Sequence, residues 1–138
     1  MTLIRRTGMV TFGETDASGR YHYVHALRWA EDTEHQVYRT LGLAVSAFPR
    51  RTVEVSYVQP LRDGDEYEVA LDVERLGVTS VSYRWTVSRD ASPVATGRHV
   101  VVHVDEAGRP TPLPPELRAH LAAFALSASG DVRHETDS

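Results

Sequence analysis

The sequence predicts an α+β domain in which one long helix packs against a five-stranded antiparallel sheet. Three observations favour this fold class: an amphipathic helical pattern over residues 26–41, alternating apolar residues in five stretches, and short turns between the four stretches that follow the helix. Consecutive strands joined by hairpin-length connections form an antiparallel sheet. At about 1.5 Å per residue, the helix is long enough to cross several strands spaced about 4.8 Å apart, so the sheet can curl around it.

The first strand is expected over residues 5–12, where apolar residues alternate loosely before Gly13. The helical pattern follows from Val24, with apolar residues recurring at three- and four-residue steps and the charged residues, Glu34 among them, largely off this stripe. Gly42 supplies the helix stop, because glycine readily adopts the left-handed conformation that closes a helix.

Four more strands are expected over residues 52–58, 67–76, 81–87 and 94–104, separated by turns rich in glycine, proline and aspartate. A short helix is expected over residues 115–126. Three alternating side chains share one face of the strand over residues 52–58, namely Val53, Val55 and Tyr57.

The composition is that of an ordinary globular protein. Its 138 residues suffice for one core, and we expect a single domain over residues 1–126 with a polar, disordered tail over residues 127–138. The net charge of −4 disfavours a nucleic-acid surface, and the lack of cysteine and lysine excludes thiolate and Schiff-base chemistry. Without a signal peptide or a long apolar run, we expect no membrane segment and a cytoplasmic location.

The most informative stretch is residues 12–25, which places Asp16 in a glycine-containing turn shortly before the helix. Backbone N–H groups at a helix N-terminus lack partners within the helix and can receive negative charge. This pairing suggests acyl-transfer chemistry. The plainer alternative is that Asp16 only hydrogen-bonds its own turn, and we interpret the nearby Glu14 as a solvated strand end.

Histidine spacing argues against a metal centre. His22 and His25 are three residues apart without a third ligand at helical spacing. His99 and His103 share a strand face, but at about 3.3 Å per residue they lie roughly 13 Å apart. We therefore expect neither a metal nor another cofactor.

A series of short blocks begins with the Asp16 turn. They are Asp16-Ala17-Ser18-Gly19, Tyr21-His22-Tyr23, Leu27-Arg28-Trp29, Gly42, Tyr57-Val58-Gln59-Pro60-Leu61, Gly64-Asp65, Val73-Glu74-Arg75-Leu76-Gly77 and Ala95-Thr96-Gly97-Arg98. Together they span nearly the whole chain, which resembles the hotdog-fold thioesterases, in particular the 4-hydroxybenzoyl-CoA thioesterase family of acyl-CoA hydrolases.

This resemblance implies that Asp16 acts as nucleophile or general base on the thioester carbonyl, and that the backbone N–H of Tyr23 helps to hold the oxyanion. Thioesters are activated acyl donors, so a carboxylate and a helix N-terminus could suffice without a metal. His25 stands where many relatives carry an asparagine that helps to orient the site. His25 is the candidate for this orienting role, and the substitution leaves two alternatives: the usual polar network is intact, or it has been rebuilt.

The substrate that the resemblance implies is an acyl-CoA, cleaved to the free acid and CoA. Tyr21 is expected to line the acyl pocket or to pack on the sheet. Guanidinium groups suit bidentate phosphate contacts, so four arginines are candidates for binding the phosphates of CoA, although they could equally solvate strand ends: Arg50, Arg51, Arg89 and Arg98.

Two alternatives to acyl-CoA hydrolysis are open, and the predicted fold also suggests an oligomeric state. A rival substrate is a polyketide or fatty acyl chain carried by an acyl carrier protein, and a protein that binds acyl thioesters without turnover is the alternative of another class. A five-stranded sheet around one helix leaves edges and a half-open pocket that a second copy would complete. We therefore predict a homodimer or a homotetramer.

Overall fold

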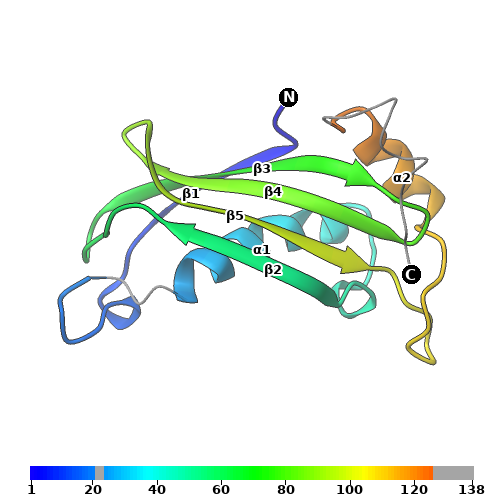
Figure 1. Cartoon of the computed structure of the whole chain (residues 1–138), viewed down its shortest axis with the longest axis horizontal. Coiled ribbons are helices and arrows are strands. Elements are labelled where there is room, and N and C mark those ends of the chain that lie inside the picture. The colour runs from blue at the N-terminus through cyan, green and yellow to red at the C-terminus, as the bar shows by residue number, and fades with distance from the viewer. Residues whose placement is uncertain (21–23, 126–138) are drawn as a thin grey trace.

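A five-stranded antiparallel sheet covers one side of a long helix in the computed structural model, which describes residues 1–20 and 24–125 (Figure 1). The strands lie in the order β1-β3-β4-β5-β2, and the predicted fold class is confirmed. The long helix is α1 (Val24–Thr40), and the short helix α2 (Pro115–Ala122) contacts β3. The strands are β1 (Ile4–Met9), β2 (Arg50–Tyr57), β3 (Glu66–Leu76), β4 (Ser80–Arg89) and β5 (Ser92–Val102).

The core lies between α1 and the inward face of the sheet. Trp29 of α1 stacks on Tyr67 of β3, with ring centroids 4.0 Å apart and planes inclined by 17°. Every second residue is buried in β3 from Tyr67 to Val73 and in β4 from Val81 to Val87, as a sheet with one covered face requires. These inward residues include Tyr67, Val69, Leu71 and Val73 of β3 and Tyr83, Trp85 and Val87 of β4.

One glycine of β5 makes room for the largest side chain of the sheet. A Cβ atom on Gly97 would lie 2.2 Å from Cζ2 of Trp85 and 2.7 Å from the backbone oxygen of Glu54. Neither distance is compatible with a real atom, because the Trp85 ring is fully buried and the second contact is backbone. Gly97 is therefore required by packing and not by a turn.

Three elements, β1, β5 and α2, end at least two residues earlier than expected. The first strand ends at Met9, because the chain turns into a single-turn 3-10 helix, η1 (Phe12–Glu14), that leaves Phe12 78% exposed. The last strand ends at Val102 and α2 ends at Ala122, both earlier than the apolar patterns suggested. A second 3-10 turn, η2 (Val45–Ala47), precedes β2. The expected tail over residues 127–138 lies outside the described residues.

Strand β2 lies at an edge of the sheet, next to β5 (Figure 1). Its expected apolar face is only partly buried: Val55 is half-buried, whereas Val53 is 40% and Tyr57 45% exposed. Val58, directly after the strand, is 61% exposed. The apolar alternation of β2 therefore is not explained by the core of one chain.

Candidate active site

The turn that contains Asp16 is tightly hydrogen-bonded. The N–H of Asp16 donates to the oxygen of Arg20, and the N–H of Gly19 donates to the oxygen of Asp16, each at 2.9 Å. Gly19 has a φ of +80°, which glycine adopts without a steric penalty. Oδ1 of Asp16 accepts hydrogen bonds from the backbone and the hydroxyl of Ser18, at 2.8 and 2.5 Å. The turn thus fixes the direction of the carboxylate.

Asp16 lines a groove between its own turn and the end of β2. The groove has a volume of about 300 Å³ and is lined by Asp16, Ser18, Arg20, Tyr57, Val58, Gln59 and Pro60. Gln59 is held in place because its amide donates to the hydroxyl of Ser92 and to the backbone oxygen of Pro93. One wall is therefore apolar, and the other carries a carboxylate and a guanidinium group. This combination suits an apolar acyl or pantetheine chain next to a reacting centre.

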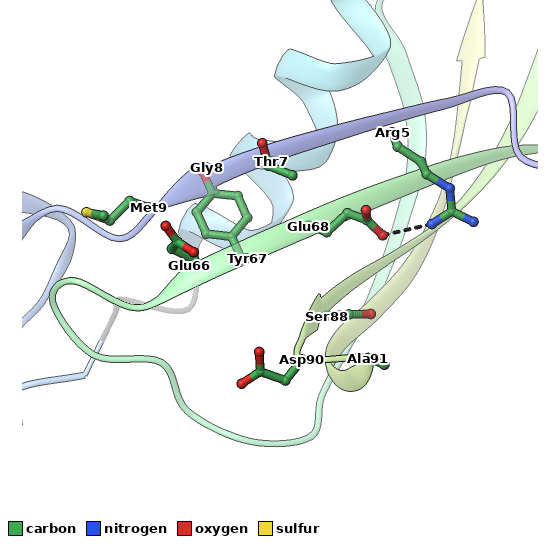
Figure 2. A pocket seen from close by; sticks show the side chains of 10 residues that line it. All are labelled: Arg5, Thr7, Gly8, Met9, Glu66, Tyr67, Glu68, Ser88, Asp90 and Ala91. Atoms are coloured by element: carbon green, nitrogen blue, oxygen red, sulfur yellow. Dashed lines mark hydrogen bonds and ion pairs between the residues drawn. The ribbon is translucent and has the colours of Figure 1, made fainter.

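A larger depression than the Asp16 groove, about 870 Å³, lies elsewhere, across β1, β3 and the β4–β5 turn (Figure 2). Its charged side chains are mostly acidic, including Glu66, Glu68 and Asp90. Arg5, which also lines this depression, pairs with Glu68 at 2.7 Å, and a dashed line marks this ion pair in Figure 2. An anionic CoA ester would be repelled there, so size alone does not identify the active site.

Tyr21 and Tyr23, two of the expected site residues, directly precede α1 in the sequence. The helix begins at Val24, whereas Tyr21, His22 and Tyr23 lie outside the described residues, so the expected roles of Tyr21 and of the Tyr23 N–H stay predictions. His25, in the first turn of α1, is half-buried and lies close enough to Glu14 for its charge to affect that carboxyl. The electrostatic contact places His25 beside the segment that carries Asp16.

Glu14 is not the solvated strand end that the sequence suggested. Oε1 accepts a hydrogen bond from the N–H of Thr11, and Oε2 accepts one from the indole N–H of Trp29, both at 2.9 Å. Partial burial acts to raise the pKa of Glu14, but these hydrogen bonds and the charge of His25 outweigh it and hold the pKa below its usual value of 4.5. Glu14 is therefore a bound carboxylate between η1 and α1.

The four arginines predicted to bind phosphate do not line the groove with Asp16. Arg50 is bound to two carboxylates of α1, those of Glu31 and Glu34. Arg98 pairs with Glu74 and Glu54 on the outward face of the sheet, and Arg89 pairs with Asp65 and Asp90. Arg51 is exposed on β2. Carboxylate partners thus already hold Arg50, Arg89 and Arg98.

Two other arginines stand beside Asp16. Arg20 lines the groove, and its backbone forms an antiparallel bridge with that of Arg62. Nη1 of Arg62 lies 3.7 Å from where a Cβ on Gly19 would be, so its guanidinium group lies beside the Asp16 turn. Sequence inspection missed this pair, because residues 42 positions apart meet only through the bridge.

A buried polar network lies under the middle of α1, where Glu34 has no exposed side-chain surface. Oε1 of Glu34 lies 2.8 Å from Nε2 of His99 and 2.9 Å from Nη2 of Arg50. Oε2 accepts a hydrogen bond from the hydroxyl of Tyr38 at 2.5 Å, and this hydroxyl lies 2.9 Å from that of Tyr83. Glu34 was expected off the apolar stripe, but its four-residue spacing from Ala30 and Tyr38 places it on the buried face.

No group of three or more His, Cys, Asp or Glu side chains is arranged to hold a metal ion in residues 1–20 and 24–125. Within the same ranges, no helix is long and apolar enough to cross a membrane.

Comparison with known proteins agrees with the geometry. The model of the thioesterase-like superfamily matches residues 10–121. The chain is 29% identical over 126 residues to the 1,4-dihydroxy-2-naphthoyl-CoA hydrolase of Synechococcus sp. (strain RCC307), covering 81% of this chain and 95% of that protein. It is 28% identical over 134 residues to the corresponding hydrolase of Parasynechococcus marenigrum, covering 85% and 88%.

The chain is also similar to solved structures of thioesterases. A thioesterase from Thermus thermophilus, complexed with coenzyme A and Zn, superimposes with a TM-score of 0.81 at 26% identity over 88% of this chain and 93% of the other. A predicted thioesterase from Bacillus stearothermophilus gives a TM-score of 0.79 at 26% identity, covering 90% and 98%. The hotdog fold is confirmed, and the chain belongs to the thioesterase-like superfamily.

Proposed function

We propose that this protein hydrolyses acyl-CoA thioesters to the free acid and CoA, with Asp16 as the catalytic carboxylate. The observation that carries the proposal is the position of Asp16, which is fixed by its own turn, lines a groove with one apolar wall and precedes α1. The relatives named as CoA hydrolases and the CoA-bound structural neighbour support the substrate class.

The chemistry needs only a carboxylate and an oxyanion site. As a general base, Asp16 takes a proton from water while the water oxygen adds to the thioester carbonyl; the C–S bond then breaks and the CoA thiolate receives a proton. As a nucleophile, Asp16 forms a mixed anhydride as CoA leaves, and water then hydrolyses it. In either case we assign the developing oxyanion to N–H groups at the start of α1, with that of Tyr23 foremost.

Asp16→Asn tests this assignment. The variant keeps the size of the side chain and an oxygen for the Ser18 contacts, so stability should change little. Loss of a positioned base costs about 10²- to 10⁴-fold in rate, and we expect kcat to fall by that order with little change in KM. Near-parental turnover of Asp16→Asn would show that the active carboxylate lies elsewhere.

The substrate panel should contain CoA thioesters of graded length and aromaticity, 1,4-dihydroxy-2-naphthoyl-CoA among them, and the same acyl groups on an acyl carrier protein. Preference for the carrier-bound esters would establish the rival substrate. Binding of acyl-CoA without turnover of any ester would establish the non-catalytic alternative.

We further propose that Arg20 and Arg62 contact the phosphates of the substrate, because Arg20 lines the groove, Arg62 lies beside the Asp16 turn, and no ion pair to either is seen within the described ranges. Arg20→Ala and Arg62→Ala should raise KM for CoA esters and leave it unchanged for the matching pantetheine esters, which lack phosphate. Arg5→Ala is the matched control, since Arg5 pairs with Glu68 on the outward face. Equal changes in KM for both ester types would contradict phosphate binding.

A second copy of the chain is proposed to cover β2. The outer edge of this strand has no partner strand among residues 1–20 and 24–125, and the exposed Val53, Tyr57 and Val58 lie on it or directly after it. Tyr57 and Val58 also line the groove, so the partner would complete the site. Val53→Glu should shift sedimentation towards the monomer and lower activity, whereas Val78→Glu, exposed in the β3–β4 turn, should do neither.

A further inference from the structure

The carboxylate of Glu14 connects the segment before Asp16 to the rigid core. Each of its oxygens accepts one N–H at 2.9 Å, from the backbone of Thr11 on one side and from the indole of Trp29 on the other. The first contact closes η1 upon itself, and the second crosses to α1. A surface glutamate without a structural task would not have both oxygens directed at fixed donors.

The donor from α1 is itself immobile. Trp29 is 1% exposed, and its ring stacks on Tyr67 of β3. The ring of Tyr67 is in turn confined by β1, because a Cβ on Gly8 would lie 2.5 Å from the Tyr67 hydroxyl. The packing of α1, β3 and β1 thus fixes the position of the indole N–H. The hydrogen bond from this N–H to Glu14 therefore fixes the position of η1 relative to these three elements.

The segment between Glu14 and Asp16 is short and hydrogen-bonded. Thr15 is the single intervening residue, and both its backbone N–H and its hydroxyl donate to the oxygen of Phe12, at 3.1 and 2.7 Å. A displacement of Glu14 would therefore displace Asp16 by a similar amount. A displacement of about 1 Å at a reacting group can cost about 10²-fold in rate.

We propose that Glu14 is a positioning residue that holds Asp16 in register with the start of α1 through its hydrogen bond to Trp29. The inference rests on the proposed role of Asp16 as the catalytic carboxylate. Both contacts require an acceptor, so glutamine cannot replace glutamate here: its amide nitrogen would face one of the two N–H donors. The ionised carboxylate is the form that satisfies both.

The contact can be observed directly, because the chain has only two tryptophans. A ¹H–¹⁵N spectrum should show two indole signals, and Trp29→Phe assigns them by removing one. The Trp29 signal should shift in Glu14→Gln, and in the parent it should titrate with a midpoint below 4.5, since the pKa of Glu14 is lowered. A Trp29 signal that is unchanged in Glu14→Gln would contradict the hydrogen bond.

Kinetics separate positioning from a merely structural contact. Glu14→Gln and Trp29→Phe should each lower kcat by about 10-fold to 10²-fold, with KM changed by less than about twofold. Because both remove the same hydrogen bond, the double variant should be no slower than the slower single variant. Glu68→Gln, which removes an ion pair to Arg5 on the outward face, is the matched control and should keep the parental kcat.

The outcomes are distinct. Parental kcat in Glu14→Gln despite a shifted Trp29 signal, or multiplicative losses in the double variant, would overturn the positioning role. Should Trp29→Phe not fold, Glu14→Gln decides alone, since it leaves the core packing intact. Failure of the proposed function would appear separately, as full turnover of Asp16→Asn.

Discussion

Replacing the buried carboxylate of Glu34 should be the most destabilising conservative change in the middle of α1. Glu34→Gln keeps the volume of the side chain but removes the charge that faces Arg50 and accepts hydrogen bonds from Tyr38 and His99. Breaking a buried ion pair from one side costs about 3–5 kcal/mol, because the remaining partner is left buried and uncompensated. Arg50 keeps Glu31, which places the expected loss near the lower end.

Urea unfolding followed by far-UV circular dichroism at pH 7 measures this loss, at one fixed protein concentration because self-association would add to the apparent stability. Glu31→Gln is the matched control on the same helix and the same arginine. Its side chain is 28% exposed, so its contribution should be about 1 kcal/mol or less. A Glu34→Gln loss no larger than that of Glu31→Gln would refute the reasoning.

The pH dependence of the same difference provides a second test. Burial acts to raise the pKa of Glu34, but the hydrogen bond and charge of His99, the charge of Arg50 and the hydrogen bond from Tyr38 together lower it below its usual value of 4.5. A lowered folded-state pKa stabilises the protein fully above the unfolded value, and this stabilisation is lost as the pH falls through the folded value. The gap between parent and Glu34→Gln should therefore be constant near pH 7 and shrink below about pH 4.5.

Two further predictions concern the core. Gly97→Ala should destabilise the protein by about 1–3 kcal/mol or more in urea unfolding, because the added Cβ would overlap the Trp85 ring. Gly13→Ala is the control and should not destabilise the protein, because a Cβ on Gly13 meets nothing within 4 Å. Equal losses of stability in the two variants would contradict the packing argument. Burial raises the pKa of Tyr38 and of Tyr83 well above 10.0, so stability should be full below that pH and fall above it. Tyr83→Phe should weaken this alkaline loss, and an unchanged alkaline limb would show that other groups cause it.

The helix and the strands could be predicted because their periodicity is local. The three- and four-residue steps of α1 and the alternation of β3 and β4 are set by which face each element buries, and neighbouring residues report that face directly. The alternation of β2 predicts a strand equally well, but the apolar face of this strand is largely exposed. Periodicity shows that a face is apolar and does not show what covers it.

The candidate site was predictable only where its contacts are local. The turn at Asp16 follows from Asp, Ser and Gly within four residues. The partner of Glu14 is 15 positions away and Arg20 meets Arg62 across the fold, so neither contact has a sequence signature. Glu34 is intermediate: its spacing placed it on the buried face, and its charge alone argued for the exposed one. Glu34 can lie on the buried face because three partners, Tyr38, Arg50 and His99, hydrogen-bond its carboxylate.

The exposure of Asp16 explains why the two proposals about its surroundings belong together. Electrostatic stabilisation of an oxyanion is strongest where water is excluded and the groups are already in place. In a single chain the Asp16 turn is exposed and the groove beside Tyr57 and Val58 is open. A second copy on the β2 edge would exclude water from the groove, but it would not align Asp16 with α1. That alignment comes from within the chain, through Glu14 and Trp29. Variants at the β2 edge should therefore lose activity together with self-association, whereas Glu14→Gln should lose activity as an intact oligomer.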